Sequence, residues 1–290
     1  MVCIGAIVNI QEQTMITANS NFLRLVTAEQ IYPPLKSFSD SILFYYLGHL
    51  ALQNRGELLE IGGGGSTYVL YELSENHDTT FNLCDTHKKF ATWHDNHYPN
   101  AKVNPIIEHS EALVNHEIGP FAYAHIDGDK DYNVTSADLA YCLDNLAVNG
   151  LICQDDYGNN KWPTITQAIC KAVAEGKAKV LLIGDSSIWI TKPEYYNYWM
   201  NKLATDREFE VLAAYLGVHE AEKILSCSPN YYFINSLQWV NVVKARYEEV
   251  KNTFTSQEIS TLKEIEQHRH APRYLQMPYT LQSTPGIWLD

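Results

Sequence analysis

The feature that most constrains the fold is a largely apolar run that ends in four consecutive glycines, residues 58–65. An apolar run followed by glycines and then by Ser66 and Thr67 predicts a buried strand, a tight backbone turn and a helix start. Glycine is needed in such a turn because the backbone is strained or because a ligand sits where a Cβ atom would clash. This stretch therefore predicts a nucleotide-like cofactor at the end of the first strand.

Candidate strands and helices alternate along the chain after this turn. Strands are expected at 57–61, 80–84, 102–107, 121–126, 150–154, 179–183 and 187–191. Helices are expected at 41–54, 66–75, 86–97, 110–116, 135–147, 163–175 and 195–206. The alternation predicts an α/β fold with a Rossmann-like, mostly parallel seven-stranded sheet and helices on both faces. The short turn at Gly184-Asp185 predicts an antiparallel hairpin at the sheet edge.

The length of 290 residues suits one large α/β domain with additions at both ends. We expect a helical N-terminal arm or lid at 1–55, a cofactor-binding core at 56–192 and a helical extension at 193–290. The extension is rich in tyrosine and is expected to form an acceptor pocket or the surface of a homodimer, although ordinary core packing also explains such residues.

The formal charge of −13 argues against nucleic acid and anionic membranes as partners, because an acidic surface repels both. No apolar run approaches the length of a membrane span, and no signal peptide is recognisable at the N-terminus. The six cysteines include no C-x-x-C pair, which favours reduced, mostly buried thiols. We therefore expect a cytoplasmic protein that acts on a small molecule.

Polar residues gather at five consecutive expected strand ends, which meet at one edge of a parallel sheet and form its usual ligand site. In strand order they are the glycine turn with Ser66, then Asp85, then Ser110, then Asp127 and Lys130, and finally Asp155 and Asp156. A carboxylate in the place of Asp85 is well positioned to accept hydrogen bonds from two ribose hydroxyls.

The glycine turn fits the pattern E-x-G-x-G-x-[GST] through Glu60, Gly62, Gly64 and Ser66, and it fits the dinucleotide pattern G-x-G-x-x-G poorly. This stretch resembles the first motif of class I S-adenosylmethionine-dependent methyltransferases. The resemblance implies S-adenosylmethionine as the cofactor. The residues expected to bind it are Glu60, Gly62, Gly64, Ser66, Asp85, Ser110 and Asp127.

The downstream motifs are I-D-G-D-K at 126–130, N-G-L-I at 149–152 and D-D-Y at 155–157. Their order and spacing resemble the branch that contains the catechol-type and macrolide-sugar O-methyltransferases. The resemblance covers about residues 42–192, and Asn149 stands where that branch has a glycine.

Asp127, Asp155 and Asp156 are expected to face one another across adjacent strands. Three such carboxylates would repel strongly without a cation, and Mg²⁺ prefers oxygen ligands. The resemblance also implies a divalent metal at these positions, and Lys130 stands where the catechol-type enzymes carry a lysine base. The pKa of a lysine near a cation falls, so that its neutral amine can accept a hydroxyl proton. Lys130 and Asp127 are thus the expected catalytic residues.

We therefore expect a methyltransferase of secondary metabolism that acts on a small-molecule hydroxyl with the help of Mg²⁺. Three alternatives stay open. The first is a metal-independent N-methyltransferase acting on a small molecule or a peptide, and the second is a cofactor-binding protein without catalysis. The third, an NAD-dependent dehydrogenase, is opposed by the glycine pattern. Asp127 can also cap a helix, and Lys130 can be an ordinary salt-bridge partner.

Overall fold

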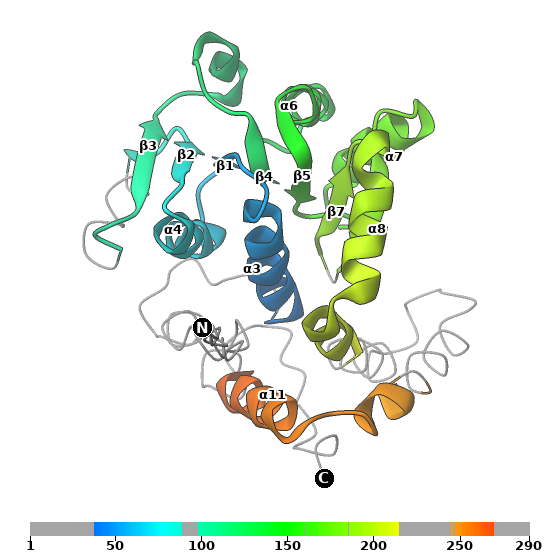
Figure 1. Cartoon of the computed structure of the whole chain (residues 1–290). Coiled ribbons are helices and arrows are strands. Elements are labelled where there is room, and N and C mark those ends of the chain that lie inside the picture. Colours follow the sequence, from blue (N-terminus) through cyan, green and yellow to red (C-terminus); the bar gives the residue numbers. More distant parts are fainter. Residues whose placement is uncertain are drawn as a thin grey trace, which may run out of the picture.

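The computed structural model describes residues 38–88, 98–159, 161–184, 186–214, 245 and 247–269. Seven strands form one sheet in the order β3-β2-β1-β4-β5-β7-β6 (Figure 1). Their bounds are β1 Glu57–Ile61, β2 Thr80–Cys84, β3 Lys102–Ile106, β4 Phe121–Ile126, β5 Leu146–Gln154, β6 Lys179–Ile183 and β7 Ile188–Thr191. Most of the expected helix at 86–97 lies outside the described residues, as do residues 1–37.

The strands β3, β2, β1, β4 and β5 are parallel, and β7 is antiparallel to both of its neighbours, β5 and β6. This confirms the Rossmann-like, mostly parallel sheet and the antiparallel hairpin at its edge. Within the hairpin, β6 is the outermost strand and β7 lies between it and β5.

Helices flank the strands in the alternation that the sequence predicts. Their bounds are α3 Phe38–Leu52, α4 Ser66–His77, η2 Ser110–Asn115, α6 Tyr132–Asp144, α7 Pro163–Ala174, η3 Pro193–Tyr195, α8 Tyr196–Thr205 and α11 Ser256–Arg269. The elements η2 and η3 are 3₁₀ helices. No helix within the described ranges combines the length and the apolar character that crossing a bilayer requires.

Both ends of helix α6 differ from the prediction for identifiable reasons. Helix α6 begins three residues earlier than the expected 135–147, because the Asp131 side chain caps it by accepting hydrogen bonds from the amides of Asn133 and Val134. The predicted helix also ran too far, because β5 already begins at Leu146.

Successive strand residues point to opposite faces of the sheet, and each face is covered by helices. Leu58, Tyr123 and Leu151 pack with buried residues of α3, α4 and α8. Their neighbours Leu59 and Ala124 pack with buried residues of α6 and α7 on the other face. Helices therefore cover both faces, as predicted, and the strands between them are buried on both sides.

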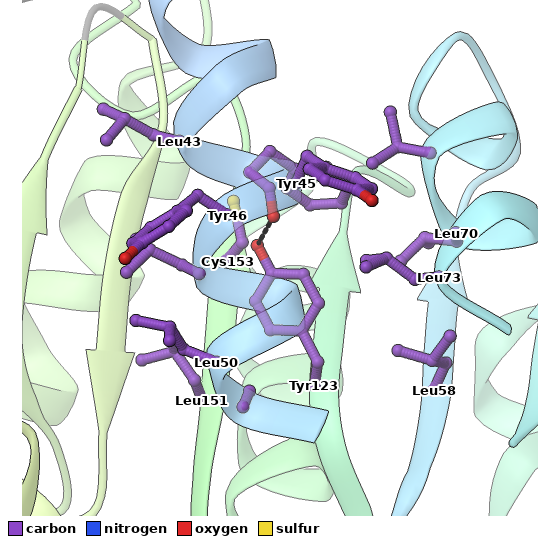
Figure 2. Packing of buried hydrophobic residues seen from close by; sticks show 14 of the residues in the cluster. Leu43, Tyr45, Tyr46, Leu50, Leu58, Leu70, Leu73, Tyr123, Leu151 and Cys153 are labelled. Atoms are coloured by element: carbon purple, nitrogen blue, oxygen red, sulfur yellow. Dashed lines mark hydrogen bonds between the residues drawn. The ribbon is translucent and has the colours of Figure 1, made fainter. Parts of the chain in front are cut away.

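Helix α3 is fixed to the sheet by polar contacts as well as apolar ones (Figure 2). The Tyr123 hydroxyl on β4 donates to the Phe44 carbonyl at 3.2 Å. The same hydroxyl accepts from Trp189 Nε1 on β7 at 3.0 Å. Tyr123 and Trp189 are fully buried, so these hydrogen bonds satisfy groups that are removed from water.

The described cysteines are free thiols. Cys84, Cys142 and Cys153 are buried, as expected, whereas Cys170 on α7 is exposed. Burial raises the pKa of the Cys84 thiol to about 12, which makes this thiol unreactive near neutral pH. The cysteines at positions 3 and 227 lie outside the described residues.

Candidate active site

The strand order reverses between β1 and β4, and in open α/β sheets ligands bind in the crevice outside the carboxyl ends of the strands at such a point. The glycine turn follows β1, and Asp127 follows β4. The Asp127 amide donates to the Ile61 carbonyl at 2.8 Å, and Gly62 has a φ of +89°. A Cβ atom on Gly62 would lie 2.5 Å from the Asp127 carbonyl oxygen. The two loops are thus in direct contact, and only glycine fits at residue 62.

The shape of the glycine turn is fixed by Glu60, whose side chain is fully buried. Its Oε1 accepts a hydrogen bond from Ser66 Oγ, and its Oε2 accepts one from Thr67 Oγ1, both at 2.6 Å. Thr67 Oγ1 in turn accepts from the Gly64 amide at 2.8 Å. Glu60 and Ser66, both predicted to bind the cofactor, therefore bind each other, while a Cβ on Gly64 would meet nothing within 4 Å. The open side of the turn is at Gly64.

Asp85 follows β2 and joins that strand to the glycine turn. Its Oδ2 accepts from the Gly63 amide and its Oδ1 from the His87 amide, each at 2.6 Å. The side chain is 10% exposed. Because a carboxylate offers about four acceptor positions, these two bonds leave it able to accept hydrogen bonds from a ligand.

Ser110 begins η2 after β3, and its hydroxyl bonds with Asp138 of α6. The Asp138 side chain is buried, and its Oδ2 has no hydrogen-bond partner within the described parts of the chain. Burial raises the pKa of this carboxyl to about 6, and the bond from Ser110 opposes that rise. Asp138 was not predicted as a site residue. Its place among Leu139, Cys142 and Leu143 is the sequence signal that this carboxyl is buried.

Lys130 lies between carboxylates from two loops. Its Nζ is 2.5 Å from Asp127 Oδ1 and 2.9 Å from Asp156 Oδ2. Burial alone would lower the pKa of Lys130, but the two carboxylates outweigh this effect and raise the pKa above its usual value. The lowered pKa predicted for Lys130 beside a bound cation stays a prediction, as does the role of Lys130 as a base.

Asp155 and Asp156, the two acids after β5, lie in different surroundings. Asp155 is nearly buried and accepts from the hydroxyls of Ser187 and Ser186 at 3.3 and 3.5 Å. Asp156 has a φ of +57° and accepts from Asn159 Nδ2 at 3.0 Å. The structure thus directs Asp155 toward the segment before β7, whereas Asp156 faces Lys130.

The predicted metal ligands fit a cation in part. Asp127 and Asp156 both contact the Lys130 ammonium, so two carboxylates reach one cationic centre. Oxygen donors of this kind are the ones that Mg²⁺ prefers. However, no three His, Cys, Asp or Glu residues within the described ranges are grouped to hold a metal ion. A magnesium site stays a prediction.

His125 on β4 is a second residue that was not predicted to belong to the site. It is fully buried, and its Nδ1 lies 3.1 Å from Glu60 Oε1. Glu60 and His125 are register partners on the parallel strands β1 and β4. Alignment of the two strands by their polar ends at Gly62 and Asp127 brings Glu60 and His125 opposite each other. The pair could therefore have been predicted from the sequence.

Residues 59–157 match the model of a family described as a methyltransferase domain. The match runs from β1 to the loop after β5. It includes the glycine turn, Asp85, Ser110, Asp127, Lys130, Asp155 and Asp156. This segment is therefore similar to a methyltransferase domain, in agreement with the resemblance that the sequence motifs carry.

No curated protein matches the chain. Similar solved structures include cofactor-bound Rv0187 from MTB, which is 17% identical with a TM-score of 0.45 over 63% of this chain and 92% of that one. CalS11, a TDP-rhamnose 3′-O-methyltransferase of calicheamicin biosynthesis, is 16% identical with a TM-score of 0.46 over 63% and 88%. MycE from the mycinamycin pathway, in complex with Mg and SAH, is 14% identical with a TM-score of 0.42 over 53% and 49%.

Proposed function

We propose that this protein transfers a methyl group from S-adenosylmethionine to the hydroxyl of a small molecule. The observation that carries the proposal is the meeting of two loops at the reversal of strand order. The glycine turn after β1 is bonded to Asp85, and the loop after β4 holds Asp127 and Lys130. The methyltransferase domain spans both loops.

The cofactor side of the site would be built by Asp85 and the glycine turn. Asp85 would accept hydrogen bonds from the ribose hydroxyls, because its carboxylate keeps acceptor capacity beyond the bonds to Gly63 and His87. The open space at Gly64 would let a ligand approach the backbone closely. When bound, S-adenosylmethionine supplies an electrophilic methyl group on a sulfonium.

The acceptor side would be built by Lys130, Asp127 and Asp156. The two carboxylates hold the Lys130 Nζ beside the end of β4, and in its neutral form this amine is the candidate for taking the acceptor's proton. A divalent cation on the same carboxylates would supply Lewis acidity. Positioning of two substrates contributes up to about 7–11 kcal/mol to such reactions. We infer a small acceptor because the charge of −13 gives no attraction to nucleic acid.

Calorimetric titration with S-adenosylhomocysteine tests the cofactor. We expect one site per chain with a micromolar or lower Kd, weakened at least about tenfold by Asp85→Ala, because charged hydrogen bonds are lost. Asp144→Ala is the matched control, since Asp144 is an exposed acid at the far end of α6. Correctly folded protein that does not bind S-adenosylhomocysteine would overturn the proposal.

Turnover after chelation, and after Mg²⁺ is restored, tests the metal. We expect loss with EDTA, recovery with Mg²⁺, and strongly reduced turnover in Asp155→Ala and Asp156→Ala. If chelation and Asp155→Ala both leave turnover intact, the metal part of the proposal fails and the transfer itself still stands.

A second candidate is a metal-independent N-methyltransferase. It is favoured by the Lys130 ammonium, which offsets one of the two negative charges of Asp127 and Asp156 and so reduces the repulsion that would call for a metal. An acceptor screen that pairs each hydroxyl compound with its amine analogue, with and without EDTA, separates the two candidates.

A further inference from the structure

A buried pair of ionisable residues connects β4 to the glycine turn. Glu60 and His125 have fully buried side chains, and the distance from His125 Nδ1 to Glu60 Oε1 is 3.1 Å. They face each other on adjacent parallel strands, on the side of the sheet covered by α3 and α4. The ring of His125 also meets the Phe44 ring edge to face, with centroids 4.8 Å apart, so α3 holds the imidazole from the other side.

The pair is the first step of a continuous chain of hydrogen bonds. Glu60 Oε2 accepts from Thr67 Oγ1 at 2.6 Å, and Thr67 Oγ1 accepts from the Gly64 amide at 2.8 Å. Glu60 Oε1, the atom next to His125, also accepts from Ser66 Oγ at 2.6 Å. These hydrogen bonds therefore connect the centre of the sheet to the backbone of the turn and to the first residues of α4.

The directions of these bonds are mutually consistent. When the Glu60 carboxylate is ionised it can only accept, and His125, Ser66 and Thr67 then all donate to it. The Thr67 hydroxyl donates its proton to Glu60, and its oxygen accepts a hydrogen bond from the Gly64 amide. Loss of the His125 donor would leave a buried carboxylate with one fewer hydrogen bond, which is costly in a dry interior.

We propose that His125 is a positioning residue of the cofactor site and acts through Glu60 to hold Gly64 and the start of α4 in the shape that accepts the ligand. Naming that ligand as S-adenosylmethionine rests on the proposed function. The link matters because Gly64 is the point where the turn borders open space. A turn that is ordered before the ligand arrives loses less conformational freedom on binding.

Tyr123 offers a matched control for a purely structural role. It lies on β4 two residues before His125, is fully buried, and points to the same face of the sheet. Its hydroxyl bonds with Trp189 on β7 and with the Phe44 carbonyl on α3, and both partners lie outside the glycine turn. Tyr123→Phe should therefore lower stability without changing the turn.

The test compares His125→Phe, His125→Asn and Tyr123→Phe by urea unfolding, by hydrogen exchange of the 62–67 segment without ligand, and by titration with S-adenosylhomocysteine. His125→Phe should speed exchange in 62–67 and weaken S-adenosylhomocysteine binding by at least about tenfold, the scale expected for loss of a charged hydrogen bond. His125→Asn should restore both, because an asparagine amide can donate near the place of Nδ1. Tyr123→Phe should change stability alone.

Thr67→Val breaks the same chain one step further on, and it keeps the test decisive if His125→Phe does not fold. It should also speed exchange at 62–67 and weaken S-adenosylhomocysteine binding. Wild-type affinity in His125→Phe or Thr67→Val, or an equal loss in Tyr123→Phe, would overturn the inference. A wild-type protein that does not bind S-adenosylhomocysteine, yet shows the exchange difference, would instead overturn the proposed function and leave the ordering role of His125 standing.

Discussion

The ammonium of Lys130 lies 2.9 Å from the carboxylate of Asp156 and joins the loops that follow β4 and β5. The same ammonium is 2.5 Å from Asp127, so one positive charge serves two acids. Both acids and the lysine are partly buried, which makes the cluster less screened than a surface pair.

Lys130→Met should remove this charge and leave two carboxylates facing each other. We expect turnover to fall by roughly 10²–10⁴-fold, the range for loss of an acid–base group, with a much smaller change in S-adenosylhomocysteine affinity. Steady-state kinetics and calorimetry measure the two effects. Lys171→Met is the control, because Lys171 is an exposed residue of α7 whose nearest carboxylate, Glu175, is 3.9 Å away. Wild-type turnover in Lys130→Met would exclude Lys130 from the chemistry.

Two glycine substitutions in one turn should change different properties, the stability of the fold in one case and ligand binding in the other. In Gly62→Ala the new Cβ would lie 2.5 Å from the Asp127 carbonyl oxygen, at a φ of +89°, so we expect a loss of more than about 2 kcal/mol in the free energy of unfolding. In Gly64→Ala the Cβ meets nothing, so stability should change by less than about 0.5 kcal/mol while S-adenosylhomocysteine binds more weakly. Urea unfolding and calorimetry check both. Equal stability losses in the two variants would contradict the steric argument.

His49 on α3 and His77 on α4 should make the fold sensitive to acid. Their rings share a contact of 2.8 Å between His77 Nε2 and His49 Nδ1. Burial, together with the charges of His77 and Lys202, lowers the pKa of His49 from 6.5 to about 4, and burial lowers that of His77. The unfolded chain therefore binds protons before the folded one, and stability is lost as the pH falls from about 6.5 toward 4.

His49→Gln should remove part of this sensitivity. Because the pair is partly exposed, we expect the variant to lose on the order of 1 kcal/mol less stability than the wild type between pH 7 and pH 5. Urea midpoints at the two pH values measure this difference. His116→Gln, at a half-buried histidine 3.6 Å from Glu108, is the control. An unchanged pH dependence in His49→Gln would show that the pair does not govern acid sensitivity.

Asp138 should have the opposite dependence on pH. Burial raises its folded pKa from 3.8 to about 6, so the folded state binds the proton more tightly and stability falls as the pH rises through that interval. Asp138→Asn should therefore be more stable than the wild type at pH 7.5, by about 1–3 kcal/mol, and the difference should shrink below pH 4. Urea unfolding at both pH values tests this. If Asp138→Asn were less stable than the wild type at pH 7.5, neighbouring groups would be stabilising the charged Asp138 carboxylate in the folded state, and the prediction would be wrong.

The sequence was sufficient for those parts of the fold that depend on local patterns. The strand before Gly62, the turn and the start of α4 at Ser66 follow from an apolar run and glycines, and the structure has them where expected. The end of α6 was missed because Leu143, Leu146 and Ala147 keep a helical spacing. Nothing in those residues shows that Leu146 pairs with Phe121 in the sheet.

The site was predictable as a set of strand ends but not as a set of contacts. Parallel strands bring Asp85, Asp127 and Asp156 to one edge, and this follows from topology alone. Which acid faces Lys130, and which turns to Ser187, depends on the backbone of the loop after β5, where Asp156 has a φ of +57°. Such a left-handed residue other than glycine is seldom evident from sequence.

The close approach of the Asp127 carbonyl to Gly62 bears on how this protein could be redesigned. The loop that would select the acceptor and the turn that would receive the cofactor touch backbone to backbone, with no side chain between them to absorb a shift. An engineer who moves one of them to admit a larger acceptor would displace the other. New acceptors are therefore better sought through side chains at the rim of the crevice than through insertions next to Asp127.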